Sequence, residues 1–347
     1  MYNFYPGPSR LYASVKDFAA EAFESGILEK NHRSADFMQL LEECIRLFKD
    51  RLNIPPSYKV FFTSSATECW EICAQSFLND SLFYYNGAFG EKWKVYTERI
   101  TGQTEGRAFD IQENLPVEPS GAKDVCMVVN ETSNGTALSS AVIQKIREET
   151  KDGLVMIDAV SSLGAVDYDI SQGDIWISSS QKCLGLPPGM GIMVVSPAAL
   201  VRAREKNDRR YYNSALFIED NFDCFQTPYT PNILAIYLLK RLLESLENVR
   251  VTAERISRRA GDIYRFLESS GVGEPLIHQP EVRSSTVIAA RAEDVRKVMG
   301  GLSENGVTVG KGYGRWRDTT FRIANFPAIP DEDFVVLSGL LRNFASQ

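Results

Sequence analysis

A lysine and an aspartate near the ends of two apolar segments are the residues best suited to chemistry. The apolar run 154–158 ends in Asp158. Lys182 lies 24 residues after Asp158 and closes a short polar stretch that follows the run 174–178. A carboxylate that directly follows a buried run is costly unless it is paired, and a lysine amine can form a Schiff base with a carbonyl compound. The two side chains can therefore converge on one small ligand, although a surface salt bridge is the alternative for either residue alone.

Small or polar residues follow three other apolar segments. Ser65 and Glu68 have capping-box spacing, so a helix should begin near Ala66, and its free N–H groups suit a phosphate; a simple capped helix is the alternative. Phe89 can stack on a flat ring or join the core. The segment 130–135 (N-E-T-S-N-G) carries more polar groups than its Asn-Gly turn requires.

Pyridoxal phosphate is the cofactor that suits this set of residues. It needs a lysine for covalent attachment, a carboxylate to keep its pyridine nitrogen protonated, a phosphate cup and a flat group against its ring. The protonated ring draws electrons from a substrate carbon, and the freed lysine amine can move the proton.

The hydrophobic pattern predicts an α/β fold. Short apolar runs typical of buried strands lie at 58–62, 81–85, 125–130, 154–158, 174–178 and 191–196. Helical periodicity lies at 14–25, 34–52, 66–78, 89–99, 139–151, 229–248 and 250–270. Strands that alternate with helices predict a mostly parallel sheet sandwiched by helices, with ligands at the carboxyl ends of the strands.

The chain of 347 residues is long enough for two domains. We expect an N-terminal extended arm over 1–15, a large cofactor-binding α/β domain over 16–250 and a smaller C-terminal α+β domain over 251–347. The last of these rests on mixed strand and helix patterns at 283–290, 293–304, 320–325 and 331–346.

Composition excludes several other classes of protein. The net charge of -7 and the lack of a basic stripe argue against a nucleic-acid partner, and no apolar run approaches the roughly 20 residues of a membrane span. The six cysteines form no C-x-x-C pair, and no signal peptide is apparent, so we expect a cytoplasmic protein with reduced thiols. The two histidines, His32 and His278, lie in no metal-binding motif, so no metal site is expected.

Across nearly its whole length the chain resembles the class V, fold-type I pyridoxal-phosphate aminotransferases, and within them it is most similar to the phosphoserine aminotransferases. The matching segments are N-F-Y-P-G-P (3–8), N-H-R-S-A-D-F (31–37), N-E-T-S-N-G (130–135), D-A-V-S-S (158–162), S-Q-K (180–182), Q-T-P (226–228) and F-R-I-A-N (321–325). The resemblance implies a transaminase that moves an amino group between an amino acid and a 2-oxo acid, in serine biosynthesis, as a homodimer.

The resemblance also implies a role for each matching residue. Lys182 would carry the cofactor and shuttle the proton, Asp158 would pair with the pyridine nitrogen, and Arg322 would bind the substrate α-carboxylate. His32 and Arg33 would bind a substrate phosphate. The remaining cofactor-binding residues would be Ser65, Ala66, Thr67 and Gln181 around the phosphate, Phe89 on the ring, Thr132 at the 3′ oxygen, and Gln226 and Thr227 on the phosphate of the neighbouring subunit.

Two positions depart from the phosphoserine aminotransferase pattern. Glu68 stands where an arginine is usual and would repel a phosphate, and Tyr313-Gly314 replaces a usual His-Arg pair. Arg315 and Arg317 lie close by and can compensate, or they can belong to a solvated basic loop.

Other functions therefore stay open at this point. A transaminase for unphosphorylated donors, such as alanine or serine with glyoxylate or pyruvate, is the first alternative. A non-catalytic cofactor-binding relative is a second. A cysteine desulfurase is disfavoured, because Gln181 stands where those enzymes have histidine and no cysteine follows Cys224.

Overall fold

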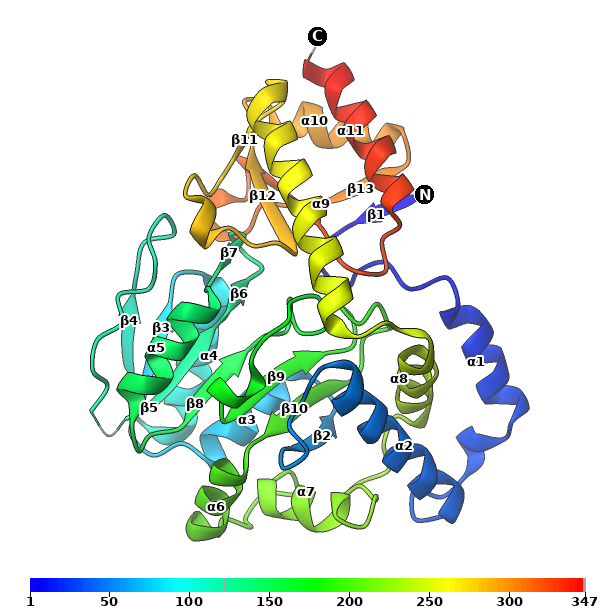
Figure 1. The fold of residues 1–347 in the computed structure, drawn as a ribbon, viewed down its shortest axis with the longest axis vertical. Coiled ribbons are helices and arrows are strands. Elements are labelled where there is room, and N and C mark those ends of the chain that lie inside the picture. Colours follow the sequence, from blue (N-terminus) through cyan, green and yellow to red (C-terminus); the bar gives the residue numbers. More distant parts are fainter. Residues whose placement is uncertain (122, 346–347) are drawn as a thin grey trace.

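The computed structural model describes residues 1–121 and 123–345, and its largest element is a seven-stranded sheet (Figure 1). Its strands lie in the order β2 (Lys59–Thr63), β10 (Gly191–Val195), β9 (Ile175–Ser179), β8 (Val155–Asp158), β5 (Asp124–Val128), β3 (Ser81–Tyr85) and β4 (Glu105–Ala108). Neighbours from β9 to β4 pair in parallel. The predicted, mostly parallel α/β sheet is thus confirmed, and all six predicted strands occur within one or two residues of their expected bounds.

Strand β10 is the antiparallel member, pairing with β2 on one side and β9 on the other. Residues 180–190, which join β9 to β10, contain no helix. A parallel return would need a crossover of a dozen or more residues, so the chain turns back beside β9 as a hairpin. This hairpin loop carries Lys182 at the carboxyl end of β9.

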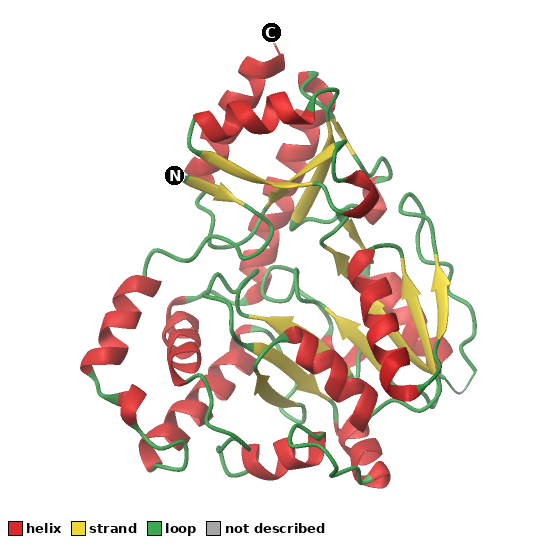
Figure 2. Ribbon diagram, turned by 180° about the vertical axis from the view of Figure 1, so that it is seen from behind, coloured by secondary structure: helices red, strands yellow, loops and turns green. Residues whose placement is uncertain are grey.

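Helices lie on both faces of this sheet (Figure 2). They are α2 (Ala35–Arg51), α3 (Ala66–Ser76), α4 (Ala88–Thr101), α5 (Ser140–Thr150), α6 (Pro197–Lys206), α7 (Ala215–Phe222) and α8 (Ile233–Ser245), preceded along the chain by α1 (Val15–Glu24). A serine hydroxyl accepts the N–H of the third helical residue at four of these N-termini, namely those of α2, α3, α5 and α6. The local sequence therefore sets where these helices begin.

The core lies between the sheet and these helices. The side chains of Met156 and Ile157 in β8 and of Ile177 in β9 are fully buried. Burial of each such side chain contributes roughly 1.5–3 kcal/mol. This rigid core holds the strand ends, and the loops after them, in fixed positions.

A second, five-stranded sheet is formed mainly by the C-terminal part of the chain. Its order is β1 (Tyr2–Phe4), β13 (Val307–Lys311), β14 (Thr320–Ala324), β12 (Val287–Arg291) and β11 (Glu274–Pro275). The helices of this region are α9 (Val249–Ser270), α10 (Val295–Glu304) and α11 (Asp331–Ala345). Figure 1 shows these elements together in the upper part of the molecule, as the expected α+β tail requires.

The N-terminal segment links the two sheets. Strand β1 pairs in parallel with β13, and residues 5–12 then run to the β9–β10 loop, where Ser9 and Tyr12 bond to the backbone of Gln181 and Gly185. The domain limits expected near residues 15 and 250 stay predictions. Within the described ranges, no helix is long and apolar enough to cross a membrane.

Candidate active site

Lys182 lies in the β9–β10 loop and contacts the N-terminal segment. Its amine donates a hydrogen bond of 2.6 Å to the backbone oxygen of Pro6, and Ser9 Oγ donates to the backbone oxygen of Lys182. A Cβ at Gly7 would lie 2.7 Å from the lysine Cε and Nζ, so the close approach requires glycine. Burial, followed by the nearby charge of Arg322, lowers the pKa of Lys182 to about 8.

Asp158 ends β8 and is almost fully buried, with 3% of its surface exposed. The Trp70 indole donates to Oδ2 at 2.9 Å, and the Val160 N–H donates to Oδ1 at 2.9 Å. Burial raises the pKa of Asp158 to about 6, while these two donors and the charge of Lys182 act in the opposite direction. The charges of Asp158 and Lys182 each affect the pKa of the other.

Glu131, in the short hairpin of β6 (Asn130–Glu131) and β7 (Thr136–Ala137), fixes the segment that carries Phe89. Its Oε2 accepts the backbone N–H groups of Phe89 at 3.1 Å and Gly90 at 3.2 Å, and Oε1 accepts the N–H of Ser133. The buried carboxylate thereby caps α4 and orients Phe89, whose ring centroid lies 5.9 Å from Lys182 Nζ. Sequence reasoning noted the polar 130–135 segment but gave Glu131 no role.

The N-terminus of α3 supplies free donors. Ser65 Oγ accepts the N–H of Glu68, as the capping-box spacing predicts. The backbone N–H groups of Ala66 and Thr67 have no acceptor among the described residues. Two unbonded N–H groups at a helix N-terminus form an anion site.

Glu68 does not reach back to Ser65. Its Oε2 instead accepts the N–H and hydroxyl of Ser64, while Oε1 accepts the Tyr212 hydroxyl at 2.9 Å and the Asn213 amide. Two donors from Ser64 and two from the loop before α7 therefore hold this carboxylate in place.

Arg322 in β14 joins the second sheet to the site. Its Nη1 donates to the backbone oxygen of Thr132 and its Nε to that of Lys311, both at 2.7 Å. Nη2 has no partner within the described part of the chain. The Tyr313 ring lies 5.5 Å from the guanidinium and 5.6 Å from the Phe89 ring, a contact that no local pattern indicated.

We call Lys182, Asp158, Phe89, Arg322 and Tyr313 the Lys182 cluster. Thr132 and Gln181 contact it, or the N-terminal segment beside it, through their backbone oxygens. Thr132 is bound to Arg322, and Gln181 accepts the N–H of Ser9. The hydroxyl of Thr132 and the side-chain amide of Gln181 have no hydrogen-bond partner among residues 1–121 and 123–345. Both groups are thus available to a ligand.

Four predicted site residues lie in two connections between helices. Gln226 and Thr227 lie between α7 and α8, where the Gln226 amide contacts Met38 Sδ and the Thr227 hydroxyl donates to the Tyr229 oxygen. His32 and Arg33 lie in the connection between α1 and α2, which Figure 1 shows at the outer edge of the molecule. The roles proposed for these four residues stay predictions.

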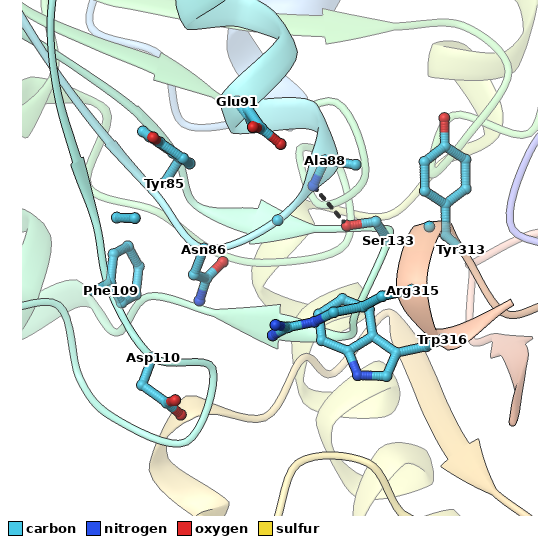
Figure 3. Close-up of a pocket in the computed structure, with 13 residues that line it drawn as sticks. Tyr85, Asn86, Ala88, Glu91, Phe109, Asp110, Ser133, Tyr313, Arg315 and Trp316 are labelled. Atoms are coloured by element: carbon cyan, nitrogen blue, oxygen red, sulfur yellow. Dashed lines mark hydrogen bonds between the residues drawn. The ribbon is translucent and has the colours of Figure 1, made fainter.

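A cavity of about 560 Å³ lies beside the cluster, between the β3–α4 turn and the loop after β13 (Figure 3). Ser133 and Tyr313 line it on the side of the cluster, and Figure 3 shows the Arg315 guanidinium directed toward its centre. Glu91 and Asp110 also line it. In the residues that the structure describes, no group of three or more histidine, cysteine or acidic side chains is arranged to hold a metal.

Comparison with known families gives one match over most of the chain. The family model described as "Aminotransferase class-V" matches residues 100–314. This range includes Thr132, Asp158, Gln181, Lys182 and Gln226.

Individual relatives extend the match to nearly the whole length. The chain is 25% identical to a phosphoserine aminotransferase of Nocardioides sp., over 97% of this chain and 93% of the relative. It is 30% identical to an uncharacterized aminotransferase of Methanocaldococcus jannaschii, over 75% of this chain and 71% of the relative. Among solved structures, a phosphoserine aminotransferase from Cytophaga hutchinsonii aligns with a TM-score of 0.92 and 28% identity, covering 99% of this chain and 98% of that one.

Proposed function

The chain belongs to the class-V aminotransferase family, and we propose that Lys182, Asp158 and Arg322 are the residues with which it carries out amino transfer. It is a pyridoxal-phosphate-dependent transaminase of fold type I, acting on amino acids and 2-oxo acids. One set of contacts supports these roles most: the Phe89 ring lies 5.9 Å from Lys182 Nζ and 5.6 Å from the Tyr313 ring, which lies 5.5 Å from the Arg322 guanidinium. The charge of the buried Asp158 also acts on Lys182.

The free groups of the site fit the parts of the cofactor. The unbonded N–H groups of Ala66 and Thr67 suit its phosphate, with Ser65 and Gln181 beside them. The buried carboxylate of Asp158 suits its pyridine nitrogen, and the Phe89 ring suits one face of its ring. The hydroxyl of Thr132 suits the 3′ oxygen.

The residues of the chain have distinct tasks in the reaction. When bound, pyridoxal phosphate supplies an electron-withdrawing ring beside the substrate Cα–H bond. Asp158 provides the negative charge that keeps the ring nitrogen protonated. Lys182 Nζ, with a pKa of about 8, takes up and returns a proton near neutral pH. Arg322 orients the substrate α-carboxylate through its unpartnered Nη2.

We propose phosphoserine and its 2-oxo counterpart as the substrate pair. Support comes from the relatives named phosphoserine aminotransferase, one of which matches over 97% of the chain, and from the Arg315 guanidinium in the adjoining cavity. Arg315 has no carboxylate partner among the described residues, so it is available for a substrate phosphate. His32 and Arg33 would add to the phosphate site from a second subunit.

A transaminase for small unphosphorylated donors is the second candidate. Glu68 carries a carboxylate where phosphoserine aminotransferases usually have arginine, and its hydrogen bonds to Ser64 and Tyr212 keep it at the N-terminus of α3. Glu91 and Asp110 in the cavity add further negative charge. These acidic groups favour a substrate without a phosphate.

One titration separates the two candidates. The holoenzyme is mixed with phosphoserine or, separately, with alanine, and conversion of the cofactor to its amine form is followed by visible absorbance. The proposal predicts conversion at a much lower concentration of phosphoserine than of alanine. Conversion by alanine alone would assign the chain to the second candidate, and conversion by neither amino acid would contradict both.

Two further proposals concern assembly and location. We propose a homodimer in which Gln226 and Thr227 reach the phosphate site of the partner, as the resemblance to the class V aminotransferases implies. Sedimentation should then give twice the chain mass of 38.9 kDa.

We propose a cytoplasmic location because all six cysteines are free, and thiol titration of the unfolded protein should count all of them as reduced.

A further inference from the structure

The indole of Trp70 is the one side chain that donates a hydrogen bond to Asp158 within the described residues. The Nε1–Oδ2 distance is 2.9 Å, and both residues are buried, at 4% and 3% exposure. Trp70 lies in α3, 88 residues before Asp158. The other carboxylate oxygen accepts the backbone N–H of Val160, a contact that any residue at position 160 except proline would supply.

A buried carboxylate remains ionised only if donors replace the water it has lost. We propose that Trp70 is a positioning residue that keeps Asp158 ionised and fixes the orientation of its carboxylate toward the cofactor's pyridine nitrogen. This inference rests on the proposed role of Asp158. Trp70 touches neither substrate nor cofactor in this account, and it acts only through Asp158.

A neighbouring tryptophan shows that this hydrogen bond is not a general consequence of packing. Trp93 in α4 stacks on Trp70, with ring centroids 6.0 Å apart and planes inclined by 12°. It is fully buried, yet its Nε1 has no hydrogen-bond partner. Two indoles in the same cluster therefore differ in one respect that matters here, since only Trp70 donates to Asp158.

The charged and titratable groups around Asp158 set the pH at which Trp70 should matter. Glu131 raises the pKa of Asp158 and Lys182 lowers it, and the thiols of Cys69 and Cys73 on α3 also face the carboxylate. With all of them present, burial places the pKa of Asp158 at about 6. The carboxylate is therefore mostly ionised at pH 7, and loss of one donor moves its titration into the neutral range.

The test compares Trp70→Phe with the matched control Trp93→Phe. Each change removes one indole from the same buried cluster, so their packing losses are similar. The dissociation constant for pyridoxal phosphate is measured from pH 5.5 to 8.5. A hydrogen bond to a charged group is worth about 1.5–3 kcal/mol, so the acidic weakening of cofactor binding should begin about one to two pH units higher in Trp70→Phe.

At pH 7 this shift makes binding by Trp70→Phe about two- to fifteenfold weaker than binding by Trp93→Phe. An analogue of pyridoxal phosphate with carbon in place of the ring nitrogen should abolish the difference, because it cannot pair with Asp158. Equal pH profiles for the two variants would overturn the inference. A difference that persists with the analogue would also overturn it, because the effect would then not pass through the ring nitrogen.

Failure of the proposed function gives a different result. The wild-type protein would then not bind the cofactor at all, or would bind it without dependence on Asp158.

If Trp70→Phe does not fold, nuclear magnetic resonance of the wild-type protein with 15N-labelled tryptophan tests the inference instead. The indole N–H resonance of Trp70 should shift with the titration of Asp158 while that of Trp93 stays constant, and a constant Trp70 resonance would overturn the inference.

Discussion

Arg322 donates a hydrogen bond of 2.7 Å from Nη1 to the backbone oxygen of Thr132. This bond links a strand of the second sheet to the turn of the β6–β7 hairpin. Together with the Nε bond to Lys311 it fixes the plane of the guanidinium and leaves Nη2 directed elsewhere. The carboxylate-binding role proposed for Arg322 therefore depends on one contact within the second sheet and one with the β6–β7 hairpin.

The substitution Arg322→Lys should raise the KM of every amino acid donor by a similar factor, about ten- to a hundredfold. Lysine keeps the charge but loses the planar fork that holds two backbone oxygens and a carboxylate together. Steady-state kinetics with phosphoserine and alanine measure the effect.

Arg283→Lys is the matched control for this change. Arg283 also donates to backbone oxygens, those of Ile277 and His278, but in a loop of the second sheet. Its KM values should equal those of the wild type. An increase for one donor alone in Arg322→Lys would indicate side-chain recognition and contradict the assignment.

Asp158→Asn should reduce turnover by at least about a hundredfold, because the cofactor's ring nitrogen loses its counter-charge. The free energy of unfolding should fall by only about 1–3 kcal/mol, the range for one unsatisfied buried donor. Turnover per folded molecule and urea unfolding give the two quantities.

Asp174→Asn provides the comparison. Asp174 is also buried and hydrogen-bonded, to Val155 N–H and Arg147. It directly precedes β9, whereas Asp158 ends the parallel strand β8, so the two aspartates lie at opposite edges of the sheet. Substitution of Asp174 should reduce stability and leave turnover unchanged. If both variants lost only stability, Asp158 would have a structural role.

The stability of the cofactor-free protein should depend on the charge of Lys182. Its pKa is lowered from 10.5 to about 8 in the folded state. Between these values the unfolded chain keeps a proton that the folded protein has released, so stability rises with pH. Lys182→Met lacks this dependence, and its advantage over the wild type, on the order of 3 kcal/mol at pH 7, should shrink as pH rises through 8 toward 10.5. Urea unfolding across this window measures it, and a constant difference would contradict the lowered pKa.

The adjoining cavity predicts which arginine recognises a substrate phosphate. Arg315 lines the cavity, so Arg315→Ala should raise the KM of phosphoserine about tenfold, the loss of one charged contact, and leave that of alanine unchanged. Arg317→Ala removes a nearby exposed arginine that does not line the cavity and should change neither value. Equal effects of both substitutions would point to general electrostatic attraction.

Much of the fold could be predicted because the central strands are continuous apolar runs. Strand β4 (E-G-R-A) was missed, since an edge strand with polar residues has no such run. Helices α6 and α7 were also missed, although Ser196 followed by Pro197 is a helix start signal. Strand β13 was missed too, because its sequence V-T-V-G-K alternates apolar and polar residues over only three positions.

The candidate site was predictable only in part. Asp158 and Lys182 could be identified because they lie close to the ends of their strands, where the sheet itself places them. Trp70, Pro6 and Tyr313 could not, because their contacts join residues far apart in the chain and leave no local pattern. The hydrogen bonds of Glu68 to Tyr212 and Asn213 were hidden for the same reason.

Identification of the lysine that carries the cofactor tests the central claim most directly. Borohydride reduction of the holoenzyme fixes a covalently held cofactor to its lysine, and peptide mass spectrometry then locates it. The account predicts the added mass on the peptide that contains Lys182, and its absence from a Lys182→Ala variant that still folds. Label on a different lysine, or equal labelling of the variant, would contradict the account.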